Sequence, residues 1–264
     1  MAMRVTNESL VEEKGDAFIK EQTRNMYKST KKKIEKGVAF PTCISVNNIV
    51  CHFSPLASDE TVLEDGDVVK IDLGCHIDGF IVVVAHTHVI QDGPVTDRKA
   101  DVITAANTTA EVALRLVRSG KKSKDVTKAI QRVTAAYDCK IVEGVLSHQL
   151  KQFVIDGNKV VLSVSTPEVR VDAEFEENEV YAVDIVVSTG EGKPKLLDEK
   201  QTTIYKRAVD KNYHVNDEHV VEEVEKSVAE EDPLEEEPLK EEHKIATKAE
   251  NADAEMVPIR EGIG

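Results

Sequence analysis

The side chains in this chain that could do chemistry are a few carboxylates and histidines set among apolar residues. Asp72 lies in an apolar run, and Asp184 stands between Val183 and Ile185. A carboxylate on a strand can bind a metal ion, but it can equally accept backbone hydrogen bonds, so both interpretations stay open for Asp72. Inside a pocket Asp184 would need a partner, and His148 is the candidate. Residues of these types can form hydrogen-bonded carboxylate–histidine pairs.

Other kinds of chemistry are not indicated. The four cysteines show no CxxC spacing, and we interpret them as free thiols of an intracellular protein, with redox sensing or metal binding as the alternative: they are Cys43, Cys51, Cys75 and Cys139. His86 and His88 alternate on one strand face, which favours packing over metal binding. No serine or cysteine nucleophile forms a recognisable arrangement with a histidine.

Two short groups of lysines could contact phosphates as point charges. The first consists of Lys31, Lys32, Lys33 and Lys36. The second consists of Lys121, Lys122 and Lys124. Aromatic residues are not interleaved with either group, so we expect no stacking on bases there. A solvated surface is the alternative for both groups, and the first is our candidate nucleic-acid-binding site.

The charge of the chain is unevenly distributed. The net charge is -15, and residues 217–264 hold 17 acidic and 5 basic residues, a local net of -12 that leaves -3 for the rest. We therefore predict a folded domain over residues 1–211 and an acidic disordered tail over residues 212–264. No segment approaches the roughly 20 apolar residues of a membrane helix. We expect no signal segment and a cytosolic or nuclear protein.

The elements that must position the candidate pocket form an α+β pattern. A helix is predicted over residues 9–27, with Ser9 and Glu12 as a capping box and Val11, Phe18, Ile19 and Met26 on one face. Strands over 68–73 and 80–90 should pair around residues 74–79. Two helices should cover 102–117 and 126–137. Further strands are predicted at 44–46, 49–51, 140–142, 180–187 and 202–205.

Four stretches resemble, in order, the sequence of type 2 methionine aminopeptidases. They are residues 40–55, with FPTCISVNN followed by CHFSP, 69–83, 146–150 with LSHQL, and 180–184 with VYAVD. The resemblance implies that His52 falls on the substrate-contacting histidine and Asp72 on the first of two metal-bridging aspartates. It also implies that His148 falls on a histidine metal ligand and Asp184 on a glutamate ligand.

The departures from that family concern the metal chemistry. The second bridging aspartate is replaced by Val83, which offers no lone pair. Asp184 is one methylene shorter than the glutamate, a second family histidine falls on Asp156, and the last bridging glutamate would lie in a strand that this chain does not contain. We expect a degenerate aminopeptidase pocket, with no catalytic residue, no metal and no cofactor. It consists of His52, Asp72, Val83, His148 and Asp184.

The pattern is most similar to the proliferation-associated, ErbB-binding proteins, which are non-peptidase relatives of these enzymes. Residues 37–55, 69–87, 143–152 and 201–206 fit that branch, and Cys43 with residues 162–164 and 193–198 indicates a truncated plant member. The resemblance implies a partial pita-bread fold and a pseudoenzyme. It also implies an RNA- and ribosome-associated regulator of ribosome biogenesis, translation and cell growth, in the nucleus or nucleolus and the cytoplasm. Its partners would be ribosomal RNA and ribosomes, with no membrane.

Two alternative functions stay open. One is a metal-dependent methionine aminopeptidase with a degraded site. The other is a protein-interaction module whose acidic tail recruits basic proteins. The branch ends in a lysine-rich tail, whereas the acidic tail of this chain should repel phosphate groups.

Overall fold

The computed structural model describes residues 8–29, 33–165, 172–195, 204–207 and 256–258. The chain divides into two units, residues 1–204 with 260–264 and residues 205–259. The first unit mixes helices with antiparallel strands, which confirms the predicted α+β class. No helix among these described residues is long and apolar enough to cross a membrane.

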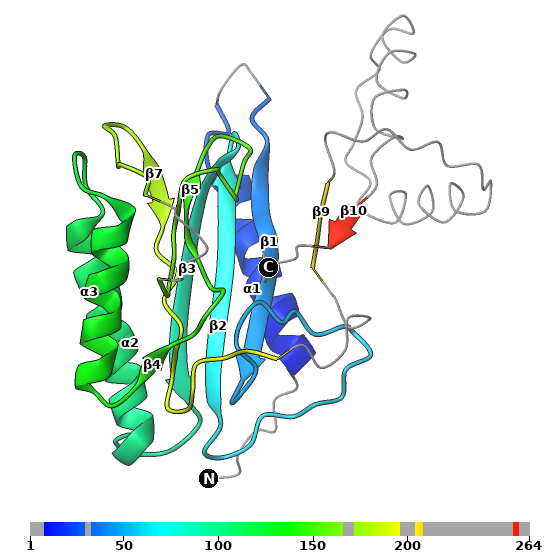
Figure 1. The fold of residues 1–264 in the computed structure, drawn as a ribbon. Coiled ribbons are helices and arrows are strands. Elements are labelled where there is room, and N and C mark those ends of the chain that lie inside the picture. Colours follow the sequence, from blue (N-terminus) through cyan, green and yellow to red (C-terminus); the bar gives the residue numbers. More distant parts are fainter. Residues whose placement is uncertain (1–7, 30–32, 166–171, 196–203, 208–255, 259–264) are drawn as a thin grey trace, which may run out of the picture. The chain divides into compact units, whose positions relative to one another are not determined.

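Three long antiparallel strands form the main sheet, in the order β1-β2-β3 (Figure 1). They are β1 (Lys36–Val46), β2 (Val68–Ile77) and β3 (Phe80–Val89). The prediction of a loop over residues 74–79 was wrong, because Ile77 pairs directly with Phe80 and only two residues make the turn. These two, Asp78 and Gly79, have φ angles of 52° and 77°, the left-handed pair that a tight hairpin turn requires. The predicted strand over 49–51 does not form.

Helix α1 (Glu8–Asn25) packs on β1 through a close contact between backbone and side chain. The backbone amide and the hydroxyl of Thr42 each donate a hydrogen bond to Asp16, both at 2.9 Å. A Cβ atom on Gly15 would lie 2.5 Å from Thr42 Oγ1, so this glycine, unfavourable for a helix in isolation, permits the approach. The helix also begins one residue before the predicted Ser9 cap.

The predicted apolar face of α1 is only half correct. Ile19 is buried, and Val11 packs against the core formed by Ile44 and Val69. Phe18 and Met26, however, are 62% and 49% exposed. Because the helix rests mainly on β1, its width covers one strip of the sheet, and residues at the edge of the predicted face project past that strip.

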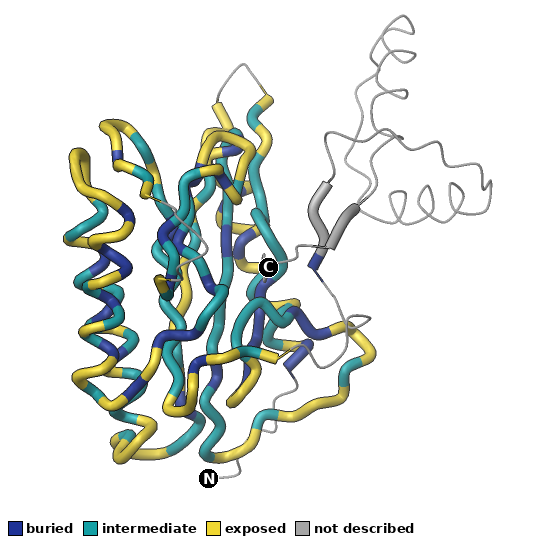
Figure 2. The backbone as a smooth tube through the Cα atoms, viewed as in Figure 1, coloured by how far each residue is buried: buried dark blue, intermediate teal, exposed yellow. Residues whose placement is uncertain are grey.

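The predicted helices over 102–117 and 126–137 are confirmed as α2 (Asp97–Leu116) and α3 (Ser123–Ala136), which lie side by side. Their apolar side chains share a second core with short strands, visible as the buried stretches of Figure 2: its buried members are Ala113, Val126, Ile130, Ile141, Val161 and Phe175. The charged side of α3 faces solvent.

Short strands build the remainder of the first unit. Strand β5 (Ser147–Leu150) lies between β6 (Val160–Val161) and β7 (Val180–Ala182), and β4 (Lys140–Ile141) pairs with β8 (Val187–Ser188). The single strand predicted over 180–187 is therefore broken between β7 and β8, and Asp184 lies in this break.

The second unit contains one described pair of strands, in which β9 (Tyr205–Arg207) pairs antiparallel with β10 (Met256–Pro258). The strand predicted over 202–205 lies outside the described residues at 202 and 203. The predicted disordered tail over 212–264 also lies outside them, apart from the three residues of β10, which pair as a strand instead.

Candidate functional site

The first half of the candidate pocket is a hydrogen-bonded pair of side chains. Asp72 stands in β2, and His52 follows β1 in a left-handed backbone conformation with a φ angle of 52°. This conformation is uncommon for a residue other than glycine, and it turns the imidazole back toward the sheet. Nδ1 of His52 lies 2.7 Å from Oδ2 of Asp72. Two predicted site residues thus meet.

An aromatic ring forms one wall of this pair. Phe40 meets the His52 ring edge-on, with centroids 6.4 Å apart and planes at 75°. The ring also passes over Gly74, its strand partner, so closely that a Cβ atom there would lie 2.4 Å from Phe40 Cε1. The absence of a side chain at Gly74 therefore lets an apolar ring shield one side of the histidine–carboxylate pair.

A third donor, Cys43, belongs to the same cluster and was missed as a site residue from the sequence. Cys43 is the Cα partner of Asp72 in the β1–β2 ladder, so both side chains project from the same face of the sheet. One donor atom each of Cys43, His52 and Asp72 lies within 4.8 Å of the others. Burial raises the pKa of the Cys43 thiol, outweighing the hydrogen bond to His52 that lowers it. No motif spacing joins these residues, and only the strand register could have found them.

Val83 is the residue that the family resemblance aligns with a metal-bridging carboxylate. It is the partner of Gly74 in the β2–β3 ladder, while Asp72 pairs with Ala85. Because paired residues point to the same side and alternate residues share a face, Val83 projects beside Asp72. Its side chain is a hydrocarbon, so it offers no metal-binding atom beside Asp72.

The other two predicted site residues, His148 and Asp184, form another histidine–carboxylate pair. Nε2 of His148 in β5 lies 3.3 Å from Oδ2 of Asp184. The Ser147 hydroxyl accepts a hydrogen bond from the Asp184 amide at 3.0 Å, which holds the break between β7 and β8 against β5. Burial disfavours the charged imidazole, yet the hydrogen bond and charge of Asp184 outweigh it and raise the pKa of His148.

The two pairs do not form a dinuclear metal site. Among the residues that the structure describes, the one group of three or more histidine, cysteine and carboxylate donors within 4.8 Å of each other is Cys43, His52 and Asp72. Neither His148 nor Asp184 joins it. Two cations need shared, hard oxygen ligands, and the neighbour of Asp72 on this sheet face, Val83, offers none. The residues present do not fit a metal pair.

The two lysine groups have different surroundings. In the first, Lys33 is exposed, whereas Lys36 donates from Nζ to the carbonyls of Arg24 and Met26 at the end of α1. Lys31 and Lys32 lie outside the described residues. Lys36 is thus engaged with the negative end of a helix dipole.

In the second lysine group, Lys122 and Lys124 approach Asp172 at 3.5 and 2.7 Å. The exposed positions Lys128 and Arg132 continue this group along α3 at four-residue spacing. Since the opposite face of α3 is buried, these side chains form an outward-facing basic stripe, defined here as Lys124, Lys128 and Arg132. The sequence interpretation had not extended the group to Lys128 and Arg132.

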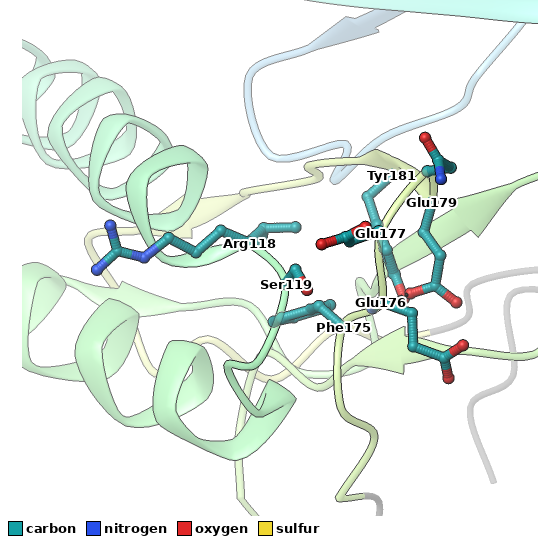
Figure 3. A pocket seen from close by; sticks show the side chains of 9 residues that line it. Arg118, Ser119, Phe175, Glu176, Glu177, Glu179 and Tyr181 are labelled. Atoms are coloured by element: carbon teal, nitrogen blue, oxygen red, sulfur yellow. Dashed lines mark hydrogen bonds between the residues drawn. The ribbon is translucent and has the colours of Figure 1, made fainter.

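A cavity of about 380 Å³ is lined by none of the residues described so far in this site (Figure 3). Phe175 and Tyr181 meet edge-on within its lining, with centroids 5.1 Å apart. Figure 3 shows the guanidinium of Arg118 directed away from the glutamates at the opposite side. Its lining contains three glutamates, so it is unsuited to phosphate groups.

The fold and the altered pocket define an aminopeptidase-like protein of the pita-bread class that lacks an intact set of metal ligands. The chain matches the model of metallopeptidase family M24 over residues 2–223, and it belongs to that family. It is 81% identical over 204 residues to ERBB-3 binding protein 1 of Solanum tuberosum, and 78% identical over 204 residues to ERBB-3 binding protein 1 of Arabidopsis thaliana. These similarities confirm the resemblance to the ErbB-binding branch and to its plant members.

The chain spans about half the length of these relatives. The matched region covers 77% of this chain, 53% of the Solanum protein and 52% of the Arabidopsis protein. Among solved structures, a thermophilic Arx1 superposes with a TM-score of 0.73 at 26% identity, covering 84% of this chain and 66% of that one. This likeness confirms the pita-bread fold.

Proposed function

We propose that this protein is a non-catalytic, RNA- and ribosome-associated regulator of ribosome biogenesis, translation and cell growth, acting in the nucleus or nucleolus and in the cytoplasm. The observation that carries the proposal is Val83, which lies on the same sheet face as Asp72 and offers no atom that could bind a metal. The high identity to ERBB-3 binding protein 1 of plants supports assignment to the non-peptidase branch.

The hydrogen bonds of the pocket support the loss of peptidase chemistry. Asp72 is engaged by His52 and Asp184 by His148, so each remaining carboxylate has a partner within the protein. A partly buried carboxylate that is hydrogen-bonded in this way does not require a pair of bridging cations to offset its charge. The pocket is therefore stable as a structural feature of the sheet.

A methionine-release assay tests the non-catalytic part of the proposal. The protein is incubated with a methionyl peptide and added cobalt or manganese. We expect no turnover from the natural chain, and none from Val83→Asp, because a single restored carboxylate leaves the altered ligand Asp184 in place. Turnover by the natural chain that Asp72→Asn abolishes would establish the enzyme alternative instead.

The basic stripe of α3 supports binding to ribosomal RNA. Its three cations lie on the exposed side of one rigid helix, at a spacing of four residues, about 6 Å along the axis. Ammonium and guanidinium groups in such a row contact successive phosphates without reading bases. Lys124 forms an ion pair with Asp172, so Lys128 and Arg132 are the stronger candidates for contacts with phosphate groups. The first lysine group, through Lys33, is a second candidate contact.

Co-sedimentation of the purified chain with ribosomes over a salt series tests this surface. We expect binding that weakens as the salt concentration rises. In the double variant Lys128→Glu with Arg132→Glu, the slope of log affinity against log salt should fall by about 1 to 2. The matched control is Lys193→Glu with Lys195→Glu, the same charge change on an exposed loop. Equal loss in both variants would indicate a net-charge effect, and no binding at low salt would refute the ribosome proposal.

A further inference from the structure

The cluster of Cys43, His52 and Asp72 contains three different metal-binding groups. A thiol, an imidazole and a carboxylate lie with one donor atom each within 4.8 Å of the others. They come from β1, from the loop that follows it and from β2, so the cluster is held by the register of two long strands. Two of the three, His52 and Asp72, already touch at 2.7 Å.

We propose that Cys43, His52 and Asp72 bind a single zinc ion. Zinc accepts sulfur, nitrogen and oxygen ligands together, at bond lengths of about 2.3 Å to sulfur and about 2.0–2.2 Å to nitrogen and oxygen. Three protein ligands leave the fourth tetrahedral position for a water molecule. A thiolate and a carboxylate also balance the two positive charges of the ion, so the occupied site is neutral.

Small movements would convert the cluster into this geometry. Two tetrahedral donors about 2.05 Å from the ion are separated by about 3.3 Å, so the 2.7 Å contact between His52 and Asp72 must open by a few tenths of an ångström. The cysteine sulfur must move inward from a separation of at most 4.8 Å. The ion then lies between Nδ1 of His52 and Asp72, and the neutral imidazole carries its one proton on Nε2, so only the thiol loses a proton.

The surroundings favour a thiolate ligand and leave a route for the ion. Cys43 is fully buried, while the side chains of His52 and Asp72 are 32% and 16% exposed, so an ion enters from their side. Phe40 closes the neighbouring side with an apolar ring. An apolar surrounding strengthens the attraction between a cation and a thiolate, and soft sulfur selects zinc over magnesium or calcium.

A cysteine nucleophile is the competing interpretation of the same three residues, and the structure disfavours it. A reactive cysteine is solvent-accessible and has a lowered pKa. Cys43 is inaccessible, and burial raises its pKa. Zinc binding needs only that the thiol release its proton to solvent as the ion arrives, with no bond made to carbon and no change of oxidation state.

Zinc titration of the purified, metal-stripped chain against a chromophoric chelator tests the proposal, with cobalt as a spectroscopic probe. We expect one zinc ion per chain, release of at least one proton per ion, and a thiolate-to-cobalt charge-transfer band. Cys43→Ser should remove the band, whereas the control variants Cys51→Ser and Cys75→Ser should retain it. A band that persists in Cys43→Ser, or zinc that binds no better than magnesium, would overturn the site.

Because a substitution at the buried Cys43 could also disturb folding, variants of the two partly exposed ligands provide a second test. His52→Gln and Asp72→Asn should each weaken zinc binding by at least about 100-fold, the upper range for losing even an outer partner of a ligand. Unchanged affinity in both variants with native circular dichroism would also overturn the site. The inference is independent of the proposed ribosome binding, since co-sedimentation of the metal-stripped chain reports on that surface alone.

Discussion

Nε2 of His148 lies 3.3 Å from Oδ2 of Asp184, which joins β5 to the break between β7 and β8. The break exists because the backbone of Asp184 bonds to the Ser147 hydroxyl at 3.0 Å and leaves the strand ladder. The pair therefore links two segments that are 36 residues apart (184 minus 148). This is a structural role for two side chains that the family resemblance assigns to metal binding.

The His148–Asp184 pair should make stability depend on pH. The pKa of His148 is raised on folding, so the protonated imidazole stabilises the folded chain. This contribution to the free energy of unfolding is fully present below the unfolded pKa of about 6.5 and is lost as the pH rises through the folded pKa. Asp184→Asn should therefore lower the free energy of unfolding by about 1–2 kcal/mol at pH 5.5 and by clearly less at pH 8.5. Urea unfolding at both pH values measures this, with exposed Asp92→Asn as the control. An equal loss at both would contradict it.

Lys70 should make stability depend on pH in the opposite direction. Burial lowers its pKa to about 8, and its ammonium donates to the Asn47 carbonyl at 2.9 Å. Since the unfolded value is about 10.5, the folded chain binds fewer protons between pH 8 and pH 10.5, and the free energy of unfolding should rise over that interval. Lys70→Met should remove this rise, and exposed Lys193→Met should keep it. Chemical denaturation from pH 7 to pH 10.5 is the measurement.

Gly74 should tolerate no side chain, because the Phe40 ring occupies its space. A Cβ atom would lie 2.4 Å from Phe40 Cε1, so Gly74→Ala should destabilise the fold by about 1–3 kcal/mol. Gly190→Ala, whose nearest atom is Ser188 Oγ at 3.5 Å, should change stability by less than about 0.5 kcal/mol. Adding Phe40→Leu to Gly74→Ala should recover part of the loss. Additive effects in that double-mutant cycle would disprove the contact.

The outer strand β3 presents an apolar strip that should make the chain self-associate. Phe80, Val82 and Val84 are 62%, 65% and 56% exposed. They project from the face of the sheet on which α1 packs, but α1 covers β1 and β2 there and leaves β3 open. An exposed apolar strand at a sheet edge pairs readily with another chain. Val82→Lys with Val84→Lys should lower the sedimentation coefficient at high protein concentration, whereas Ala135→Lys with Ala136→Lys on α3 should not. A monomeric natural chain at every concentration would refute this.

Several features of the fold could be predicted from the sequence because they depend on local patterns. The helical spacing of apolar residues located α2 and α3, and alternation with turn residues located the β2–β3 hairpin. The prediction that Val83 takes the place of a metal-bridging carboxylate likewise rests on the sequence motifs alone. The family assignment followed from the same motifs, and the comparisons confirm it.

Only the tertiary structure decided which side chains meet. Cys43 and Asp72 are 29 residues apart, and nothing in their spacing joins them, yet the β1–β2 register makes them neighbours. The exposure of Phe18 was mispredicted for the same reason, since helical periodicity gives an apolar face but not the width of the sheet that covers it. Local patterns in a sequence reflect the conformational preferences of neighbouring residues. The register between distant strands is set by the packing of whole strands, and this packing brings the Cys43 thiol beside the Asp72 carboxylate.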